Sequence, residues 1–578
     1  MNLPFFKIFK YILLIVILFN CLFASAQDRK KDTIDTDVVN VVKPYTPTIS
    51  DAFKIKETPS LSDSSALKKK PIKYNIFSIP VASTFTPAKA KAATVDREKS
   101  VKLYDNYASL GVGSYTTVLG EVYLNHELSR DEYVGGYFSH HSSQGEIDDV
   151  NFDNNFSETG LKAHYTKQER DFNWNVEGGF QLQRFNWYGV PDQSIETFDV
   201  DNNYHAIDFG GNINFEDSFI ENASVLYRRF GDSNDSGENR FVMNSEFEFP
   251  VAGETISTEL KIDYLGGAFS RNYFSDDGID YGNINFGLSP SYQLIRDDLT
   301  VNIGLRLVYL NNTEADDSDF FVYPNVTASY RLVEDIMIAF GGIEGGLIQN
   351  SYYDFAQANP FVSPTLFVAP TDQSYNISAG LKGKLSSNVN YSVSGHYQAD
   401  NNRALFKANP STDVATEKYQ FLNSFGVVYD DVNTFSVAGE LNVDINRNFK
   451  LGLKAQYFSY SVDEQEEAWN LPDIEASAFL DYQIDQHWFA GASVFYVGER
   501  KDVSGLFISN GQASNFITFP VSLNSFFDAN AHLGYKINNQ LSAFVKGNNL
   551  VGQNYNRWLN YPVQGIQFLA GATYQFDF

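Results

Sequence analysis

The 578-residue sequence predicts an all-β protein, a transmembrane antiparallel β-barrel of about 22 strands that follows a mostly extended N-terminal segment. Three observations lead to this prediction. Apolar and polar residues alternate through recurrent runs of about ten residues, short polar turns alternate with long connections, and the chain ends in an amphipathic strand. A period of two is typical of strands whose two faces meet different environments.

Residues 1–26 have the features of a cleaved secretory signal. Lysines precede an apolar run from Tyr11 to Phe19, and the small residues at 24–26 form the expected cleavage site. The apolar run is shorter than the roughly 20 residues that a membrane-spanning helix needs. Cys21 is the only cysteine and leaves with the signal, so the mature chain is predicted to have no disulfide and no Cys-based metal or catalytic site.

Residues 27–104 form a second segment, which we expect to be extended and to lie in the periplasm or in the barrel lumen. The segment contains six prolines and shows no sustained helical or strand period. From Asp28 to Tyr104 basic residues exceed acidic ones by 6, whereas residues 105–578 carry a net charge of −36. A basic segment therefore precedes an acidic predicted barrel, although unrelated local biases would give the same division.

Ten short polar turns divide residues 105–578. Ten such turns give about 22 strands if both ends of the barrel lie on the same side of the membrane. The turns begin at Ser129, Gln168, Glu216, Val251, Ile295, Val333, Ser386, Ile445, Gln483 and Ile537.

The connections between these turns are mostly long. Short periplasmic turns and long extracellular loops are the usual asymmetry of outer-membrane barrels. The stretch from Tyr419 to Asp444 is open to two interpretations, one long strand or a separate hairpin, so the strand count is uncertain by two. The long connections are 145–155, 189–203, 231–239, 350–373, 400–418, 461–470 and 498–522.

Charged residues keep to one face of the predicted strands. The run from Ile256 to Leu265 is an example. Its Leu260, Ile262 and Tyr264 lie on one face of the predicted strand, and the acidic and basic residues between them lie on the other face. A Lys or Arg at the lipid midplane would cost roughly 2–4 kcal/mol, so this sorting fits strands that contact outer-membrane lipids. The last strand places Tyr574, Phe576 and Phe578 on its apolar face, which we take as the C-terminal signal of a barrel.

The C-terminal region resembles the end of TonB-dependent receptors. An Asn-Leu pair is followed by a Tyr, a Tyr-Pro and a Gly before the final strand. The family's usual Pro and Arg around that glycine are replaced by Gln564 and Ile566. The resemblance implies an outer-membrane receptor barrel with TonB as a partner. The matching residues are Asn549, Leu550, Tyr555, Tyr561, Pro562 and Gly565.

The front of the chain departs from this family. Such receptors carry a folded plug of well over one hundred residues, whereas residues 27–104 show no globular pattern, so the plug is predicted to be missing. The run from Val41 to Lys56 looks like the front of TonB-dependent-receptor-like proteins of Bacteroidota. An acidic residue and a Thr before a Val-rich run also resemble a TonB-contacting segment, at Asp35, Thr36, Val38, Val39, Val41 and Val42.

A barrel of about 22 strands encloses a lumen that is normally filled. Three fillings are consistent with the sequence: the basic N-terminal segment, inward-folded extracellular loops, or a partner protein. The charge division favours the first of these.

Catalytic and metal sites are not expected. His140 and His141 precede two serines, but neighbours on a strand point to opposite faces and cannot form a triad. No cofactor is predicted. Acidic loops at 148–155, 199–203, 275–280 and 314–319 could supply oxygen ligands to Ca²⁺, although solvated charge is the simpler interpretation. The acidic mature chain has no nucleic-acid-binding motif, which excludes nucleic acid as a partner.

Loop aromatics could stack on a ligand or form an interfacial girdle. The residues concerned are Trp187, Tyr188, Tyr352, Tyr353, Trp469 and Trp558.

The predicted function is that of an exported outer-membrane receptor-like barrel that transports an unidentified nutrient or forms a channel for it. The alternative is a sealed structural subunit of a larger outer-membrane assembly, with surface lipoproteins or other barrels as partners. An outer-membrane enzyme is a distant third interpretation.

Overall fold

The computed structural model describes residues 102–192, 195–251, 254–412, 416–446, 448–509 and 514–578. The predicted signal and the segment 27–104 fall outside these residues, apart from Lys102, Leu103 and Tyr104. Within the described part of the chain, no helix is long and apolar enough to cross a membrane.

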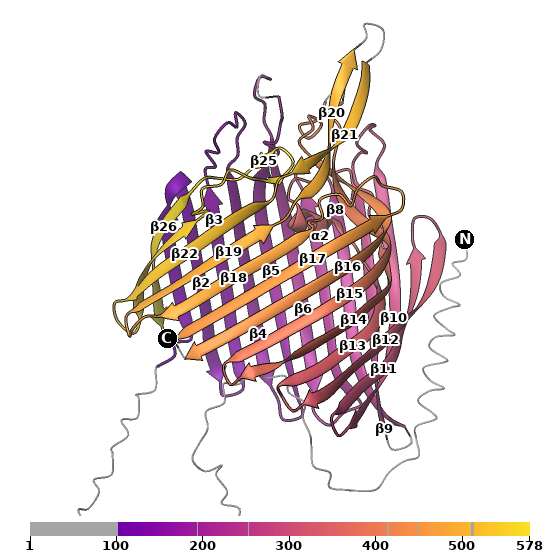
Figure 1. Cartoon of the computed structure of the whole chain (residues 1–578), viewed down its shortest axis with the longest axis vertical. Coiled ribbons are helices and arrows are strands. Elements are labelled where there is room, and N and C mark those ends of the chain that lie inside the picture. Colours follow the sequence, from indigo (N-terminus) through magenta and orange to yellow (C-terminus); the bar gives the residue numbers. More distant parts are fainter. Residues whose placement is uncertain (1–101, 193–194, 252–253, 413–415, 447, 510–513) are drawn as a thin grey trace, which may run out of the picture. The chain divides into compact units, whose positions relative to one another are not determined.

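The described residues form a closed antiparallel barrel of 22 strands (Figure 1). The barrel closes because the first strand pairs with the last, with Leu110 opposite Ala572. The barrel strands are β1 (Asn106–Gly113), β2 (Thr117–Ser129), β3 (Glu132–Ser143), β4 (Phe156–Gln168), β5 (Phe172–Asn186), β6 (Asp201–Phe215), β7 (Ile220–Asp232), β8 (Gly237–Val251), β9 (Glu254–Phe269), β10 (Ile279–Arg296), β11 (Leu299–Asn312), β12 (Asp317–Val333), β13 (Met337–Ile348), β14 (Thr371–Ser386), β15 (Val389–Ala408), β16 (Phe425–Asn446), β17 (Phe449–Val462), β18 (Ile474–Gln483), β19 (Trp488–Val497), β22 (Phe526–Lys536), β23 (Leu541–Asn548) and β26 (Gln567–Phe576).

The predicted fold class and strand number are confirmed. Each of the ten predicted turns joins two neighbouring strands, beginning with the turn between β2 and β3. The stretch that was open to two interpretations is one strand, β16, which pairs with β15 from Phe425 to Val443 and with β17 from Val432 onward. These turns could be predicted because the alternation of apolar and polar residues stops where a two-faced strand ends and a turn begins.

The remaining elements lie in the long connections. The 3-10 turn η2 (Ser114–Thr116) joins β1 to β2, and the helix α2 (Tyr352–Ala358) lies between β13 and β14. β24 (Asn556–Trp558) and β25 (Tyr561–Pro562) pair between β23 and β26. The predicted loop 498–522 instead contains a hairpin of β20 (Arg500–Ser509) and β21 (Ser514–Leu523), which projects from the barrel in Figure 1.

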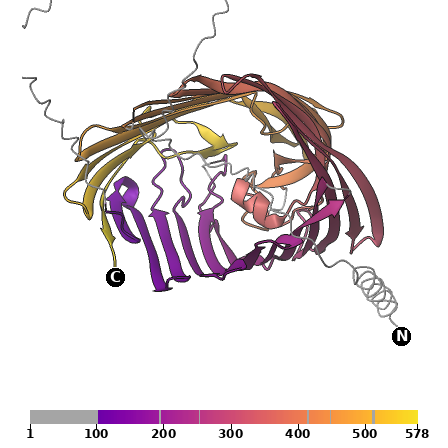
Figure 2. The same cartoon turned by 90° about the horizontal axis from the view of Figure 1, so that it is seen from below.

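The two faces of the strands are sorted as predicted. Figure 2 places α2 inside the ring of strands, and the wall residues that contact its loop therefore face the lumen. Asp263 on β9 is fully buried on this side, while its neighbour Tyr264 is 40% exposed on the outer face. Alternation along each strand then turns apolar side chains such as Leu453 towards lipid.

We predict that a cation on the outer face destabilises the barrel far more than a cation in the lumen. Leu453 lies on the outer face of β17 between Leu441 and Ala478, so Leu453→Arg should cost about 2–4 kcal/mol near the bilayer midplane. Gln456→Arg is the matched control, because Gln456 faces the lumen, where it donates to Ser436 Oγ. Urea titration of the folded fraction in lipid vesicles measures both costs, and equal costs would contradict the assigned faces.

Candidate functional site

Five long connections fold together at one end of the lumen, and we call them the loop cap. They join β3–β4, β5–β6, β13–β14, β15–β16 and β23–β26. Side chains from all five pack into one hydrophobic core with residues of the barrel wall. Core members from the five connections are Phe152, Trp187, Phe361, Tyr419 and Tyr561, each at most 9% exposed.

Hydrogen bonds join the connections of the loop cap to one another. Trp187 Nε1 donates to the carbonyl of Phe361 at 3.2 Å, and Asn423 Nδ2 donates to the carbonyl of Trp187 at 2.7 Å. Tyr188 donates to the carbonyl of Pro562 at 3.0 Å. The β5–β6 connection is therefore bonded to three other connections. Inward-folded loops, one of the three predicted fillings, do occupy this end of the lumen.

Two wall carboxylates hold the beginning of α2. Glu238 Oε2, on β8, accepts from the backbone N–H of Tyr352 at 2.6 Å and from Tyr281 OH at 2.9 Å. Asp232 Oδ2, on β7, accepts from Tyr352 OH at 2.7 Å. Burial and the nearby Asp232 carboxylate raise the pKa of the Tyr352 hydroxyl well above its usual value, so this hydroxyl remains a donor at physiological pH.

Two arginines of the wall complete this attachment, which we call the α2 latch. Arg240 contacts Asp354 of α2 at 3.1 Å and Asp263 of the wall at 2.9 Å. The Arg228 guanidinium lies 3.8 Å from the ring centre of Tyr353. Hydrogen bonds to buried charged groups contribute about 1.5–3 kcal/mol each, so these polar contacts make the latch a specific attachment. The buried Tyr352 ring adds aromatic contacts to Phe230 and Phe269 of the wall.

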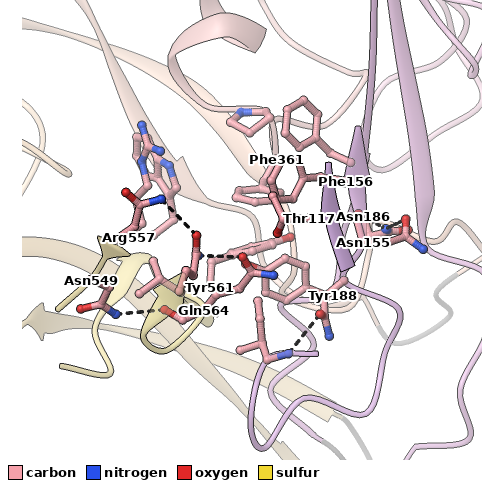
Figure 3. A pocket seen from close by; sticks show the side chains of 18 of the residues that line it. Thr117, Asn155, Phe156, Asn186, Tyr188, Phe361, Asn549, Arg557, Tyr561 and Gln564 are labelled. Atoms are coloured by element: carbon pink, nitrogen blue, oxygen red, sulfur yellow. Dashed lines mark hydrogen bonds between the residues drawn. The ribbon is translucent and has the colours of Figure 1, made fainter. Parts of the chain in front are cut away.

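The loop cap and the wall line a partly open cavity of about 380 Å³ (Figure 3). Its wall side comes from β2–β5, β22, β23 and β26, and its cap side from the β3–β4, β5–β6, β13–β14 and β23–β26 connections. Carboxamides, aromatic rings and a few charges line it. Its labelled members in Figure 3 are Thr117, Asn155, Phe156, Asn186, Tyr188, Phe361, Asn549, Arg557, Tyr561 and Gln564.

The base of the β20–β21 hairpin is attached to neighbouring connections. Asp502 accepts from the backbone N–H groups of Ala408 and Val503 and from Asn470 Nδ2, at 2.8–2.9 Å. Burial raises the pKa of Asp502 to about 6, so the carboxylate is largely ionised at neutral pH and is held by three donors. The hairpin thus begins from a fixed base.

The C-terminal residues singled out from the sequence lie at the closing strands. Tyr574 and Phe576 are on β26, with ring centres 5.7 Å apart, and the ring of Phe578 lies 5.6 Å from that of Phe576. Tyr574 is 46% exposed, on the same parity as the outward Phe568. The proposed TonB-contacting residues, Asp35 to Val42, lie outside the described residues.

Loop aromatics have a different role from the one predicted for several of them. Trp187, Tyr352 and Trp469 are at most 1% exposed and belong to cores, so neither ligand stacking nor an interfacial girdle describes them. Tyr188 and Trp558 do line the cavity. The interpretation failed because it treated these connections as solvated loops.

Within the described part of the chain, no three His, Cys, Asp or Glu side chains gather in a group that could hold a metal ion. His141 lines the cavity, whereas His140 lies on the opposite face of β3, 2.8 Å from Thr159 Oγ1, which agrees with the alternation expected of strand neighbours. Calcium binding by the acidic loops stays a prediction.

Sequence reasoning missed the α2 latch. Glu238, Arg240 and Asp232 looked like ordinary lumen charges, since their partner lies more than a hundred residues away. One signal was present: the stretch from Tyr352 to Phe361 is rich in aromatic and small residues, which is unusual for a solvated loop.

Comparison with known families identifies the barrel. The family described as TonB dependent receptor-like, beta-barrel, matches residues 98–550. The chain belongs to this family. No curated protein matches the chain in sequence.

Solved structures of bacterial receptors and transporters resemble the chain in fold. The FrpB iron transporter of Neisseria meningitidis shares 12% identity with a TM-score of 0.63, covering 82% of each chain. The ferripyoverdine receptor of Pseudomonas aeruginosa shares 13% identity with a TM-score of 0.59, over 83% of this chain and 73% of the receptor. The siderophore receptor PirA of Acinetobacter baumannii shares 12% identity with a TM-score of 0.59, over 83% and 81%. Identities this low show a shared fold, not a shared ligand.

Family membership supports several sequence predictions. TonB-dependent receptor-like barrels reside in the outer membrane and act in reception and transport rather than as enzymes, so the predicted location and the non-enzymatic role hold for this chain. The nutrient stays unidentified.

We predict that Tyr352→Phe weakens the α2 latch. The substitution removes the donor to Asp232 and leaves a buried carboxylate oxygen without it, which should cost about 1–3 kcal/mol. Chymotrypsin cleavage within residues 349–370 of the folded barrel should become about 5- to 150-fold faster, because cleavage follows local opening. Tyr309→Phe is the control, since Tyr309 is 42% exposed on the outer face of β11. Equal cleavage rates for both variants would contradict the latch.

Proposed function

We propose that this barrel is an outer-membrane receptor that takes up an unidentified nutrient, and that the β13–β14 connection is its internal gate. The observation that supports this proposal is the α2 latch, which holds a helix inside the lumen by contacts to wall carboxylates and arginines. For a solute to pass, the connection must move away from the wall.

The polar composition of the latch fits a gate better than a permanent seal. Glu238 and Asp232 can exchange their bonds to α2 for water when the connection moves, because both lie on the lumen face of the wall. Arg240 already shares its contacts between Asp354 of α2 and Asp263 of the wall, so it keeps a partner when α2 leaves. Opening therefore leaves this arginine paired.

The N-terminal segment has a separate part in this proposal. We assign to residues 28–104 the space that a folded plug fills in related receptors, on the basis of their excess of basic residues beside an acidic barrel. TonB would contact Asp35 to Val42. The similarity of the following stretch to Bacteroidota proteins implies a source phylum and adds nothing about the solute.

Removing both fillings should open the barrel. We predict that replacing residues 351–369 with a short Gly-Ser linker raises single-channel conductance in planar bilayers, and that deleting residues 28–104 as well raises it further. Glu238→Lys should act in the same direction as the linker, because it places a cation beside Arg240 and the N–H groups of α2.

The control for these recordings is Asp316→Asn, which changes an exposed carboxyl group between β11 and β12. Each variant must first migrate as a folded barrel on unheated gels. A folded double variant that conducts no better than the native protein would refute both assigned fillings.

A second candidate function, a sealed subunit of a larger assembly, is favoured by the β20–β21 hairpin. The hairpin projects from the barrel in Figure 1 and exposes Ile517 and Phe519, which are 50% and 40% accessible. Among the described residues, neither strand pairs with a third strand, although Lys501 O at the base of β20 accepts from the backbone N–H of Asn470 at 2.8 Å. The edges beyond this base can add a strand. A surface lipoprotein or another barrel is the partner that this candidate implies.

Co-purification separates the two candidates. If the hairpin holds a partner, Ile517→Asp combined with Phe519→Asp should remove a stoichiometric protein from the complex isolated in mild detergent, as measured by mass spectrometry. The double variant should retain its conductance, because both residues lie outside the lumen. A native barrel that purifies alone would favour the receptor over the subunit.

A further inference from the structure

We propose that the outer face of β5, β6 and β7 binds the phosphate group of an outer-leaflet lipid. Arg184, His205 and Arg229 contact the phosphate in this site, and the acyl chains lie along the apolar strand faces beside them. The site lies on the outside of the barrel, so it is independent of the uptake function proposed above.

Alternation along the strands places these three side chains on the lipid-facing side of the barrel. Each of the three is exposed, and each lies two positions from an exposed apolar or aromatic residue of its own strand. A charged side chain that borders such an apolar band lies where lipid headgroups meet the hydrocarbon region. The bordering residues are, in strand order, Leu182, Ile207 and Tyr227, which are 38%, 52% and 43% exposed.

The three residues form a diagonal row across adjacent strands. Leu182 pairs with His205, so Arg184 lies one diagonal step from His205 on one side. Gly231 also pairs with His205, so Arg229 lies one diagonal step from it on the other side. Diagonal neighbours are about 7–8 Å apart, which allows long side chains on both sides of His205 to reach one ligand. The row lies near the strand ends that carry the long connections, which is the outer-leaflet side of a barrel (Figure 1).

Neither arginine of the row forms an ion pair with a carboxylate of the described residues. Arg184 Nε donates to Asn203 Oδ1 at 2.9 Å, which occupies one of its five N–H groups. By contrast, Arg228 faces the lumen on the same strand as Arg229 and pairs with Asp208 at 2.6 Å. Cations that the fold leaves unpaired at the edge of the lipid indicate that an anion from the surroundings is their partner.

An open hollow of about 600 Å³ adjoins Arg229 and His205 on this face. Gly237 lets the Arg229 side chain lie close to the sheet, because a Cβ at this position would be 2.5 Å from Arg229 Nη2. Acidic residues also line the hollow. Asp280 lies on β10, three strands from Arg229, which separates their backbones by about 14 Å. The others lie at the end of β7 or in connections beyond the strands, so the phosphate lies on the arginine side; they are Asp232, Asp235 and Glu314.

A lipid phosphate matches both parts of this surface. A guanidinium binds two phosphate oxygens through parallel N–H groups, and the imidazole of His205 can donate to a third. Phe180 on β5 and Phe209 on β6 are 43% and 60% exposed and offer the acyl chains an apolar surface towards the bilayer centre. A free phosphate ion gains nothing from that surface, so the occupant that we assign is a lipid.

Native mass spectrometry of the purified full-length protein in detergent micelles tests the proposal. The probes are lipid A, a phosphorylated glycolipid, and the same lipid after enzymatic removal of its phosphates, with inorganic phosphate as a competitor. Lipid A should bind at least about 10-fold more tightly than its dephosphorylated form, and equimolar inorganic phosphate should not displace it. Equal affinity for the two lipids, or displacement by the equimolar ion, would overturn the proposal.

Two variants locate the binding. Arg184→Gln and Arg229→Gln should each weaken lipid A binding about 5-fold, the effect of one basic residue at an anionic lipid surface, and the double variant about 25-fold. Arg170→Gln is the matched control, because it removes the same charge from a side chain that is 95% exposed in the turn at the opposite end of β5. Each variant must first migrate as a folded barrel on unheated gels. A folded double variant that binds lipid A as tightly as the Arg170→Gln control would refute the assigned site.

Discussion

Pairing between the first and last strands is the constraint on which the whole structure depends. In lipid no water is available to a free N–H or C=O group, so an open sheet edge cannot remain in the membrane. The register of β1 with β26, from Asn106 opposite Phe576 to Gly113 opposite Leu569, removes that edge. Closure also determines which alternate side chains of each strand face lipid and which face inward. The inward side chains line the lumen that the loop cap fills.

A closed barrel of this size creates an interior that must be filled, and this chain fills one end with its own connections. The loop cap has a hydrophobic core built around Trp187, Tyr352 and Tyr561. The ring of Tyr352 belongs to this core, while its hydroxyl and backbone N–H belong to the α2 latch, which adds hydrogen bonds and ion pairs to the wall. Dense packing holds most of the cap in one arrangement, while the latch can exchange its partners for water.

Features that depend on the pattern of neighbouring residues could be predicted from the sequence, whereas features that depend on distant residues could not. The turn after Ser129 and the alternation around Tyr264 depend on neighbouring residues, and both were correct. The role of Tyr352 was not, because its partners Asp232 and Glu238 lie on strands more than a hundred residues earlier. The loop cap likewise joins residues such as Tyr188 and Pro562, which are 374 positions apart. A single sequence does not show which distant residues are in contact. The aromatic composition of the β13–β14 connection could therefore be recognised, but its place inside the lumen could not be predicted.

The seam between β1 and β26 also governs how the protein can be made. Its two strands lie far apart in the sequence: beside them, the backbone N–H of Asp105 donates to Asp577 Oδ1 across 472 positions. The seam cannot form until synthesis and export of the last strand are complete. Until the seam forms, β1 and β26 each present an edge of unpaired N–H and C=O groups, to which another chain can pair in an aggregate. Shielding both edges until the seam closes would prevent such aggregation.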